Sequence, residues 1–378
     1  MEENNFETLF TDEEKKEIDK EIENKLLDYE EKLKEKFLEN IENQIEEDKK
    51  ALDDVNIIVS HFTIDGSPYE YLRTEPLAFY KIKNFDVSIF SPRKNIIVLI
   101  EIEKNLSSSI QSKMSEFQSM CEMTANNRTI DSTTIFDYFS AIVRTTQLTA
   151  QNFDFVLASP ILDRRIIQDN AENMELNLNI WDLNKSGTTC TIMCSMIKSS
   201  KTAIFNGLKD QELVEYLKDC VRNRIKFSQV INFIFTTSNY LKAINITVPI
   251  ILRIQNKKDF FVYEDWEELF KMDLTNYNKE EKVTIFTNYI DFGKRCQFIE
   301  ERGNGKYRIR TRYTRDIDKL QDDIKERIIL IETAEPINNE LQKIRSEIIL
   351  QWSRKKYTGG KTLFDFTSNL EESDSSKS

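Results

Sequence analysis

The 378-residue chain contains a single histidine, His61. A zinc site built from several histidines is therefore excluded, and a Ser-His-Asp triad would depend on His61 alone. His61 lies in the run Val59-Ser60-His61-Phe62, where we interpret it as a structural residue rather than a base. If the chain is an enzyme, carboxylates, lysines and a metal ion must supply the chemistry.

Long apolar runs and close cysteine pairs are also missing. No stretch approaches the roughly 18 consecutive apolar residues of a membrane span, and the acidic N-terminus has no signal sequence. Cys190 and Cys194 would share one face of a β-type run, which indicates packing. These features predict a reduced, cytoplasmic protein without membrane insertion. The five scattered cysteines are Cys121, Cys190, Cys194, Cys220 and Cys296.

The net charge of −12 is concentrated at one end of the chain. Residues 1–54 hold 21 acidic and 9 basic residues, which accounts for the whole net charge. The remainder of the chain is neutral overall, so the acidity does not exclude binding to nucleic acid by that part.

Residues 1–54 have the apolar spacing of one long helix. Thr11 and Glu14 form a predicted capping box at its start. A single apolar stripe on so long a helix needs a cover, which favours a coiled-coil arm over a lone solvated helix. The cover would be a second copy of the chain or another of its own helices. The stripe consists of Ile18, Ile22, Leu26, Tyr29, Leu33, Phe37, Ile41 and Ile45.

Residues 55–205 alternate between strand and helix patterns, which predicts a mixed α/β sheet with helices packed on it. The predicted order is strand, strand, helix, helix, strand, helix, strand. The corresponding ranges are 85–90, 96–103, 108–123, 134–148, 153–160, 161–173 and 176–181.

The first two of these strands carry a group of carboxylates. Alternation places Glu101 and Glu103 on one face of the second strand and Lys104 on the other, and Asp86 can join the acidic face from the partner strand. Three converging carboxylates form an all-oxygen site that suits Mg²⁺ or Mn²⁺ and can act on a phosphodiester. The alternative is a hairpin with an acidic, solvated face.

Asp86 on the first strand, Glu101-Ile102-Glu103 on the second, and the following helix and strand together resemble the PD-(D/E)XK nuclease superfamily, which includes many restriction endonucleases. The resemblance covers about residues 55–185. It implies a restriction-endonuclease-like core in which Asp86 and Glu101 bind one or two Mg²⁺ or Mn²⁺ ions. Glu103 would then orient or deprotonate the attacking water.

Glu103 departs from the family pattern, which usually has lysine two residues after the glutamate. Lys104 is one position further on, on the opposite face. Three possibilities stay open: Glu103 takes the role, Lys113 on the following helix supplies the amine, or the site is inactive. The family often adds an earlier glutamate, and Gln111 and Gln118 are candidates to line the site. The candidate glutamates are Glu47, Glu70 and Glu75.

A second signal for nucleic-acid binding lies between residues 265 and 315. Two predicted helices, 265–272 and 279–296, precede a hairpin with a glycine-rich turn at 303–305, an order that resembles a winged helix. Residues 294–315 hold eight basic residues against two glutamates, which suits phosphate contact. The alternative is a basic surface hairpin without a ligand. The basic residues are Lys294, Arg295, Arg302, Lys306, Arg308, Arg310, Arg312 and Arg315.

Two further helices, 316–334 and 337–356, are predicted to be separated at Pro336, and their apolar positions could cover the stripe of the N-terminal arm. The tail resembles a sliding-clamp-binding peptide. The rival interpretation is that the tail packs on its own domain. The residues that would contact a clamp are Leu363, Phe364 and Phe366.

The sequence therefore predicts a metal-dependent DNA endonuclease, of restriction type or acting in repair, that cuts double-stranded DNA as a homodimer. The alternatives are a non-catalytic DNA-binding or clamp-associated protein that keeps the fold, and a coiled-coil adaptor. The predicted segments are an arm at 1–54, a nuclease-like core at 55–205, a helical connector at 206–250, a winged-helix-like domain at 251–315, C-terminal helices at 316–358 and a disordered tail at 359–378.

Overall fold

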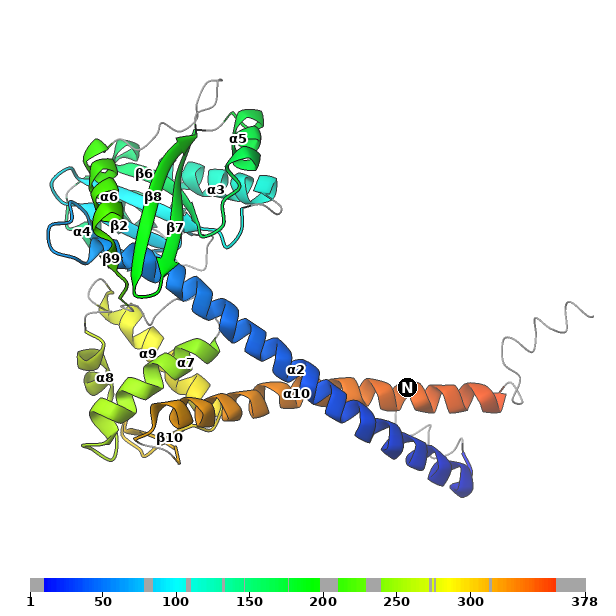
Figure 1. The fold of residues 1–378 in the computed structure, drawn as a ribbon. Helices are drawn as coiled ribbons and strands as arrows, with labels where there is room; N and C mark the ends of the chain where they lie inside the picture. Colours follow the sequence, from blue (N-terminus) through cyan, green and yellow to red (C-terminus); the bar gives the residue numbers. More distant parts are fainter. Residues whose placement is uncertain are drawn as a thin grey trace, which may run out of the picture. The chain divides into compact units, whose positions relative to one another are not determined.

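Figure 1 shows the computed structural model of the chain. It divides into two compact units, one made of Met1–Asn43 with Ile324–Ser378 and the other of Gln44–Asp323. The structure describes residues 10–77, 84–106, 110–130, 133–145, 147–175, 177–197, 210–228, 239–271, 274, 277–312 and 315–357.

The larger unit contains a mixed sheet of seven strands in the order β1-β2-β3-β6-β7-β8-β9. The β3/β6 and β6/β7 pairs are parallel and the other pairs are antiparallel. The predicted mixed α/β architecture is confirmed at this level. The strands are β1 Glu70–Thr74, β2 Val87–Ser91, β3 Ile96–Ile102, β6 Phe153–Ser159, β7 Leu178–Ser186, β8 Thr189–Ile197 and β9 Ile225–Lys226.

Helices cover both faces of this sheet (Figure 1). Leu99 of β3 belongs to a core cluster with residues of three helices, α3 Ile110–Ala125, α4 Ile135–Val143 and α5 Arg164–Asn173. Its neighbour Val98 faces the opposite cluster, which residues 52–62 of α2 and helix α6 Gln211–Asn223 complete. Because successive side chains alternate across a strand, a sheet with apolar residues at both positions must be covered on both sides.

Some elements differ from the sequence prediction. Strands β1 and β9 were not predicted, and the helix expected at 134–148 is the shorter α4 followed by a 3₁₀ turn at Ala150–Asn152. A short hairpin, β4 Thr129–Ile130 with β5 Thr133–Thr134, precedes α4. Helix α6, placed by sequence in a connector, buries Leu213 and Leu217 against the sheet. Its amphipathic pattern identifies a packed helix but not the surface on which it packs.

The smaller unit is built from α2 Asp12–Phe62, up to residue 43, and α10 Ile317–Tyr357, from residue 324. The predicted capping box is present, since the backbone amides of Thr11 and Glu14 donate to each other's side chains. Ile18 and Ile22 pack with Ile348. The helices run antiparallel, with hydrogen bonds from Lys356 to Glu14 (2.5 Å), Trp352 Nε1 to Glu21 (2.8 Å) and Lys325 to Glu42 (2.8 Å).

This pairing answers one question that the sequence left open. The stripe of the arm is covered by another helix of the same chain at Ile18 and Ile22. The predicted break at Pro336 is wrong, because α10 continues through it as one helix. A proline removes a single backbone donor and can be accommodated with a kink where the flanking sequence favours helix strongly.

Residues 239–312, here called the helix-hairpin segment, follow the order predicted for residues 265–310. They form α7 Asn239–Ile250, a π-helical turn at Ile251–Gln255, α8 Tyr263–Leu269, α9 Lys279–Arg295, β10 Ile299–Glu301 and β11 Tyr307–Ile309. Gly303 and Gly305 have φ of 85° and 69°, the left-handed conformation that a tight turn needs. Phe261 adds a bridge to Tyr307, beside the hairpin.

None of the helices in the described ranges is long and apolar enough to cross a membrane. The predicted clamp-binding residues, Leu363, Phe364 and Phe366, lie outside the described residues.

Candidate active site

Asp86 and Glu101 meet at the start of β2 and the end of β3. Val87 pairs with Ile100 in the antiparallel register, so the next position sets Asp86 opposite Glu101. Both belong to the sheet face that carries Leu99. Asp86 is fixed there because its Oδ2 accepts a hydrogen bond of 2.6 Å from the backbone amide of Ile102. The structure therefore brings together the two carboxylates that the sequence assigned to a metal.

The environment of this pair disfavours two negative charges. Burial raises the pKa of Asp86 to about 7, with a further increase from Glu75, Glu103 and Asp54, although the Ile102 amide opposes the shift. Burial and the charge of Asp86 raise the pKa of Glu101 well above its usual value. Glu101 Oε2 is buried, and it has no hydrogen-bond partner among the residues that the structure describes. A buried, unsatisfied acceptor next to a like charge costs folding free energy and therefore calls for an explanation.

Of the three upstream glutamates considered, Glu75 is the one that lies beside Asp86. It follows β1, is 1% exposed, and its backbone amide donates to the carbonyl of Asp86 over 2.7 Å. The other two candidates lie elsewhere: Glu70 is exposed at the start of β1, and Glu47 pairs with Lys104. The choice among the three depended on the path of β1, which the sequence did not predict.

Asp54 is a buried carboxylate whose charge also affects Asp86, but its helix packs on the opposite face of the sheet, and its burial was not predicted from sequence. It is buried on α2, and burial together with the neighbouring Asp53 raises its pKa to about 7. In the sequence it closes a strongly acidic helix, where it looks like one more solvated charge. We call Glu75, Asp86, Glu101 and Glu103 the acidic cluster.

Lys113 is the cation that contacts the acidic cluster. Its Nζ forms an ion pair with Glu103 and donates to the carbonyl of Asn105 over 3.2 Å. Lys104 instead pairs with Glu47 at 3.2 Å, and both of those side chains are more than half exposed. Of the two predicted catalytic lysines, the structure places Lys113 at the cluster and Lys104 outside it. Gln111 is exposed, and Gln118 donates to Glu122.

The carboxylates of Asp86 and Glu101 are candidate ligands for a divalent cation. Among the residues that the structure describes, no three His, Cys, Asp or Glu side chains form a ready metal site. Mg²⁺, however, usually takes only one or two carboxylates and completes its shell with water and substrate phosphate. Asp86 and Glu101 supply two carboxylates with an unpaired oxygen on Glu101. These residues fit Mg²⁺ or Mn²⁺.

His61 has no place in this site. Its Nδ1 lies 2.7 Å from the carbonyl of Ile57, and because a carbonyl can only accept, Nδ1 carries the proton. Burial lowers the pKa of His61 to about 4, so the ring is neutral at physiological pH. This geometry supports the structural role expected from sequence.

The predicted DNA-contacting side chains lie on α9 and on the hairpin. Lys294 pairs with Glu301 at 2.7 Å, and Arg302 and Arg310 both pair with Glu300 at 3.0 and 2.8 Å. The remaining contacts join Arg308 to Asp259, Lys306 to the Phe260 ring and Arg295 to the Phe292 ring, and Arg312 is exposed. Exposed ion pairs of this kind contribute little, so these cations can exchange their partners for phosphates.

No family model, no curated protein and no solved structure matches this chain. The functional assignment therefore depends on the geometry and electrostatics of its own residues.

Proposed function

We propose that the chain is a metal-dependent DNA endonuclease of the PD-(D/E)XK type. The observation that carries this proposal is the juxtaposition of Asp86 and Glu101 across β2 and β3, with Glu101 Oε2 buried and not hydrogen-bonded to any described residue. Buried carboxylates with raised pKa values in one site are typical of catalytic and metal-binding centres. A divalent cation would supply the opposite charge that the described side chains around Glu101 Oε2 do not.

The order of elements around the pair supports the same proposal. The antiparallel strands β2 and β3 carry the carboxylates, α3 follows, and β6 then returns parallel to β3. This is the succession on which the resemblance to the nuclease superfamily was based. The restriction-endonuclease-like fold remains part of the proposal.

Each residue of the site would have its own role in the reaction. Asp86 and Glu101 would hold Mg²⁺ or Mn²⁺, which when bound polarises the scissile phosphate and lowers the pKa of a bound water. Glu103 is a candidate to orient or deprotonate the attacking water. Lys113 would direct the side chain of Glu103, because its ammonium pairs with that carboxylate.

Double-stranded DNA is the proposed substrate. The basic residues of α9 and the hairpin give the segment 294–315 an excess of positive charge. The order of α8, α9 and the hairpin, with the additional bridge at Phe261, supports a winged-helix-like mode in which the hairpin contacts the backbone.

Cutting both strands would need two active sites, which a homodimer supplies. Since α10 covers Ile18 and Ile22 of the arm, such a dimer would use another surface. A tail that binds a sliding clamp would indicate repair or replication, whereas a fixed recognition sequence would indicate restriction.

A second candidate is a DNA-binding protein that keeps this fold without its chemistry. The observation that favours it is that Asp86 already accepts the Ile102 amide and Glu103 stands where the family usually has lysine. Salt-dependent DNA binding without metal-dependent cleavage would distinguish this candidate.

Plasmid cleavage in Mg²⁺ or Mn²⁺ tests the proposal. Wild-type protein should nick or linearise the plasmid, and the Asp86→Asn, Glu101→Gln double variant should lose at least about a thousandfold in rate, since it removes both proposed ligands. Glu70→Gln is the matched control, because it neutralises an exposed carboxylate on the neighbouring strand β1. Wild-type cleavage no faster than that of the double variant would refute the proposal.

A further inference from the structure

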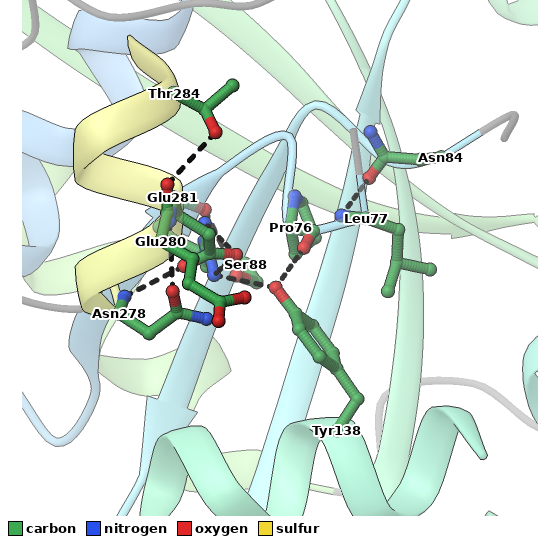
Figure 2. Close-up of polar contacts among 10 residues, drawn as sticks. Pro76, Leu77, Asn84, Ser88, Tyr138, Asn278, Glu280, Glu281 and Thr284 are labelled. Atoms are coloured by element: carbon green, nitrogen blue, oxygen red, sulfur yellow. Dashed lines mark hydrogen bonds and ion pairs between the residues drawn. The ribbon is translucent and has the colours of Figure 1, made fainter. Parts of the chain in front are cut away.

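Arg73 and Glu281 form a buried ion pair between β1 and the first turn of α9. Each residue is 2% exposed. Figure 2 shows Glu281 next to Asn278 at the start of α9, and the hydroxyl of Tyr138 directed at Pro76. Both terminal nitrogens of Arg73 lie 3.3 Å from Glu281 Oε1, while Glu281 Oε2 accepts the backbone amide of Asn278 over 2.9 Å. Glu281 therefore closes the capping box of α9 with one oxygen and holds Arg73 with the other.

Arg73 is also tied to the strand end that carries Glu75. Its Nη1 donates to the hydroxyl of Tyr138 over 2.6 Å, and that hydroxyl donates to the carbonyl of Pro76. The chain between these contacts is unusual. A bulge interrupts β1 between Tyr71 and Arg73, and bulges commonly re-aim side chains beside functional sites.

Glu75 itself has a backbone conformation that needs support. Its φ is +42°, a left-handed value that is strained for a non-glycine residue and persists only where the surrounding contacts enforce it. The enforcing contacts are the bond from its own amide to Asp86 and, one residue later, the bond from Tyr138 to Pro76. The backbone amide of Leu77 adds a third, to Asn84, over 3.0 Å.

Tyr277, directly before the N-cap of α9, joins the two groups. The guanidinium carbon of Arg73 lies 4.1 Å from the centre of its ring. Burial raises the pKa of Tyr277 to about 12, Arg73 opposes the shift and the charge of Glu75 adds to it. The Tyr277 ring therefore contacts the guanidinium of Arg73 and is close enough to Glu75 for that carboxylate to affect its pKa.

We propose that Arg73 is a positioning residue through which the first turn of α9 holds Glu75 in the acidic cluster, so that DNA contact by the helix-hairpin segment sets the geometry for cleavage. This proposal rests on the proposed nuclease function, but hydrogen exchange near Glu75 can be measured whether or not the protein cleaves DNA. The connection runs from Glu281 to Arg73, to Tyr138, and to the backbone at Pro76.

Stability alone does not account for this ion pair. A buried pair often contributes no more than apolar residues of similar volume, because the loss of hydration offsets the attraction. The planar guanidinium, in contrast, can contact a carboxylate, a hydroxyl and an aromatic face at the same time. That geometry fixes the end of β1 relative to α9 in a way that apolar packing would not.

Glu281→Gln is the primary test, since glutamine can keep the capping box and removes only the charge that faces Arg73. Hydrogen exchange of the Glu75 and Leu77 amides should accelerate by about tenfold or more relative to amides of β6, which report global opening. Mn²⁺ should bind about tenfold more weakly in direct titration. Glu280→Gln, the same change at the adjacent exposed position, should leave both quantities within about twofold.

Tyr138→Phe provides a second, milder variant that leaves the Arg73 and Glu281 pair in place. It should accelerate exchange at Leu77 more than at β6, and a non-cleavable DNA duplex in Ca²⁺ should slow the same amide in wild type. A purely structural pair would accelerate β6 and the β1 end equally, and that result in both variants would overturn the proposal. If exchange changes as expected but wild type cleaves no DNA, the nuclease proposal fails and the positioning role stands.

Discussion

Two groups of buried charge lie on neighbouring strands of the sheet, and they are built in opposite ways. In the network around Arg73, the cation meets Glu281, Tyr138 and the Tyr277 ring. In the acidic cluster, Asp86 and Glu101 face each other, and one oxygen of Glu101 has no hydrogen-bond partner within the described ranges. The charge of Arg73 is compensated by Glu281, although its Nε has no partner among the described residues, whereas no side chain of opposite charge pairs with Asp86 or Glu101 within the part of the chain that the structure describes.

This difference predicts opposite effects of mutation on the stability of the fold. Breaking a compensated pair leaves a buried charge alone, so it should destabilise the fold. Removing one of two like charges relieves repulsion, so it should stabilise the fold while it abolishes the chemistry. The same kind of substitution is therefore expected to act with opposite sign in the two groups.

The largest expected effect is on the compensated group. Arg73→Met should lower the free energy of unfolding by about 3 to 5 kcal/mol, because Glu281 would be left buried without its cation. Denaturant titration followed by circular dichroism measures this loss. The additional change Glu281→Met should recover most of it, since the pair is then replaced by apolar side chains.

Arg222→Met is the matched control for that measurement. Arg222 also pairs with a carboxylate, Asp219 at 2.9 Å, but both side chains are more than 60% exposed. Its loss should change stability by less than about 1 kcal/mol. Equal effects of Arg73→Met and Arg222→Met would show that burial does not distinguish the two pairs.

An intermediate effect is expected from Lys113, which forms an ion pair with Glu103 of the acidic cluster. Lys113→Met should lower cleavage about a hundredfold, because Glu103 loses the ammonium that directs it. Lys104→Met, the same substitution on the other face of the sheet, should stay within about twofold, since its exposed pair with Glu47 contributes little. Initial rates of plasmid nicking at saturating Mg²⁺ compare them, and a larger loss for Lys104→Met would reverse the assignment.

The elements that sequence predicted well are those with strong periodicity. The hairpin of β2 and β3, the helix α3 and the long α2 follow from apolar spacing and turn residues. The same alternation placed Asp86 and Glu101 on one face, as the register of the two strands bears out.

The missing parts of the site depended on long-range packing. The position of Glu75 depends on a bulged strand of five residues, which is too short to give a clear sequence pattern. Asp54 is buried only because its part of α2 packs against the Val98 face of the sheet. The partner of Arg73 lies 208 residues away. Contacts of this kind have no local signature, since propensity and periodicity describe only neighbours in sequence.

The smallest expected effect is an increase in the free energy of unfolding, opposite in sign to the decrease expected for Arg73→Met. The pKa of Glu101 is raised in the folded protein, so the folded state binds more protons than the unfolded state above the usual value of 4.5. Stability is therefore present at low pH and lost as the pH rises through the folded pKa. Glu101→Gln removes this loss, and without divalent cations at pH 8 it should be more stable than wild type by roughly 1 kcal/mol or more.

Thermal unfolding at pH 4 and pH 8 checks this sign. The advantage of Glu101→Gln should vanish at pH 4, where wild-type Glu101 is itself neutral, and Glu122→Gln on the exposed side of α3 should show none at either pH. Mg²⁺ at pH 8 should raise the unfolding temperature of wild type but not of Glu101→Gln, because a bound cation stabilises only the folded state that holds its ligands. A variant less stable than wild type at pH 8 without metal would mean that Glu101 is compensated within the chain, as Arg73 is.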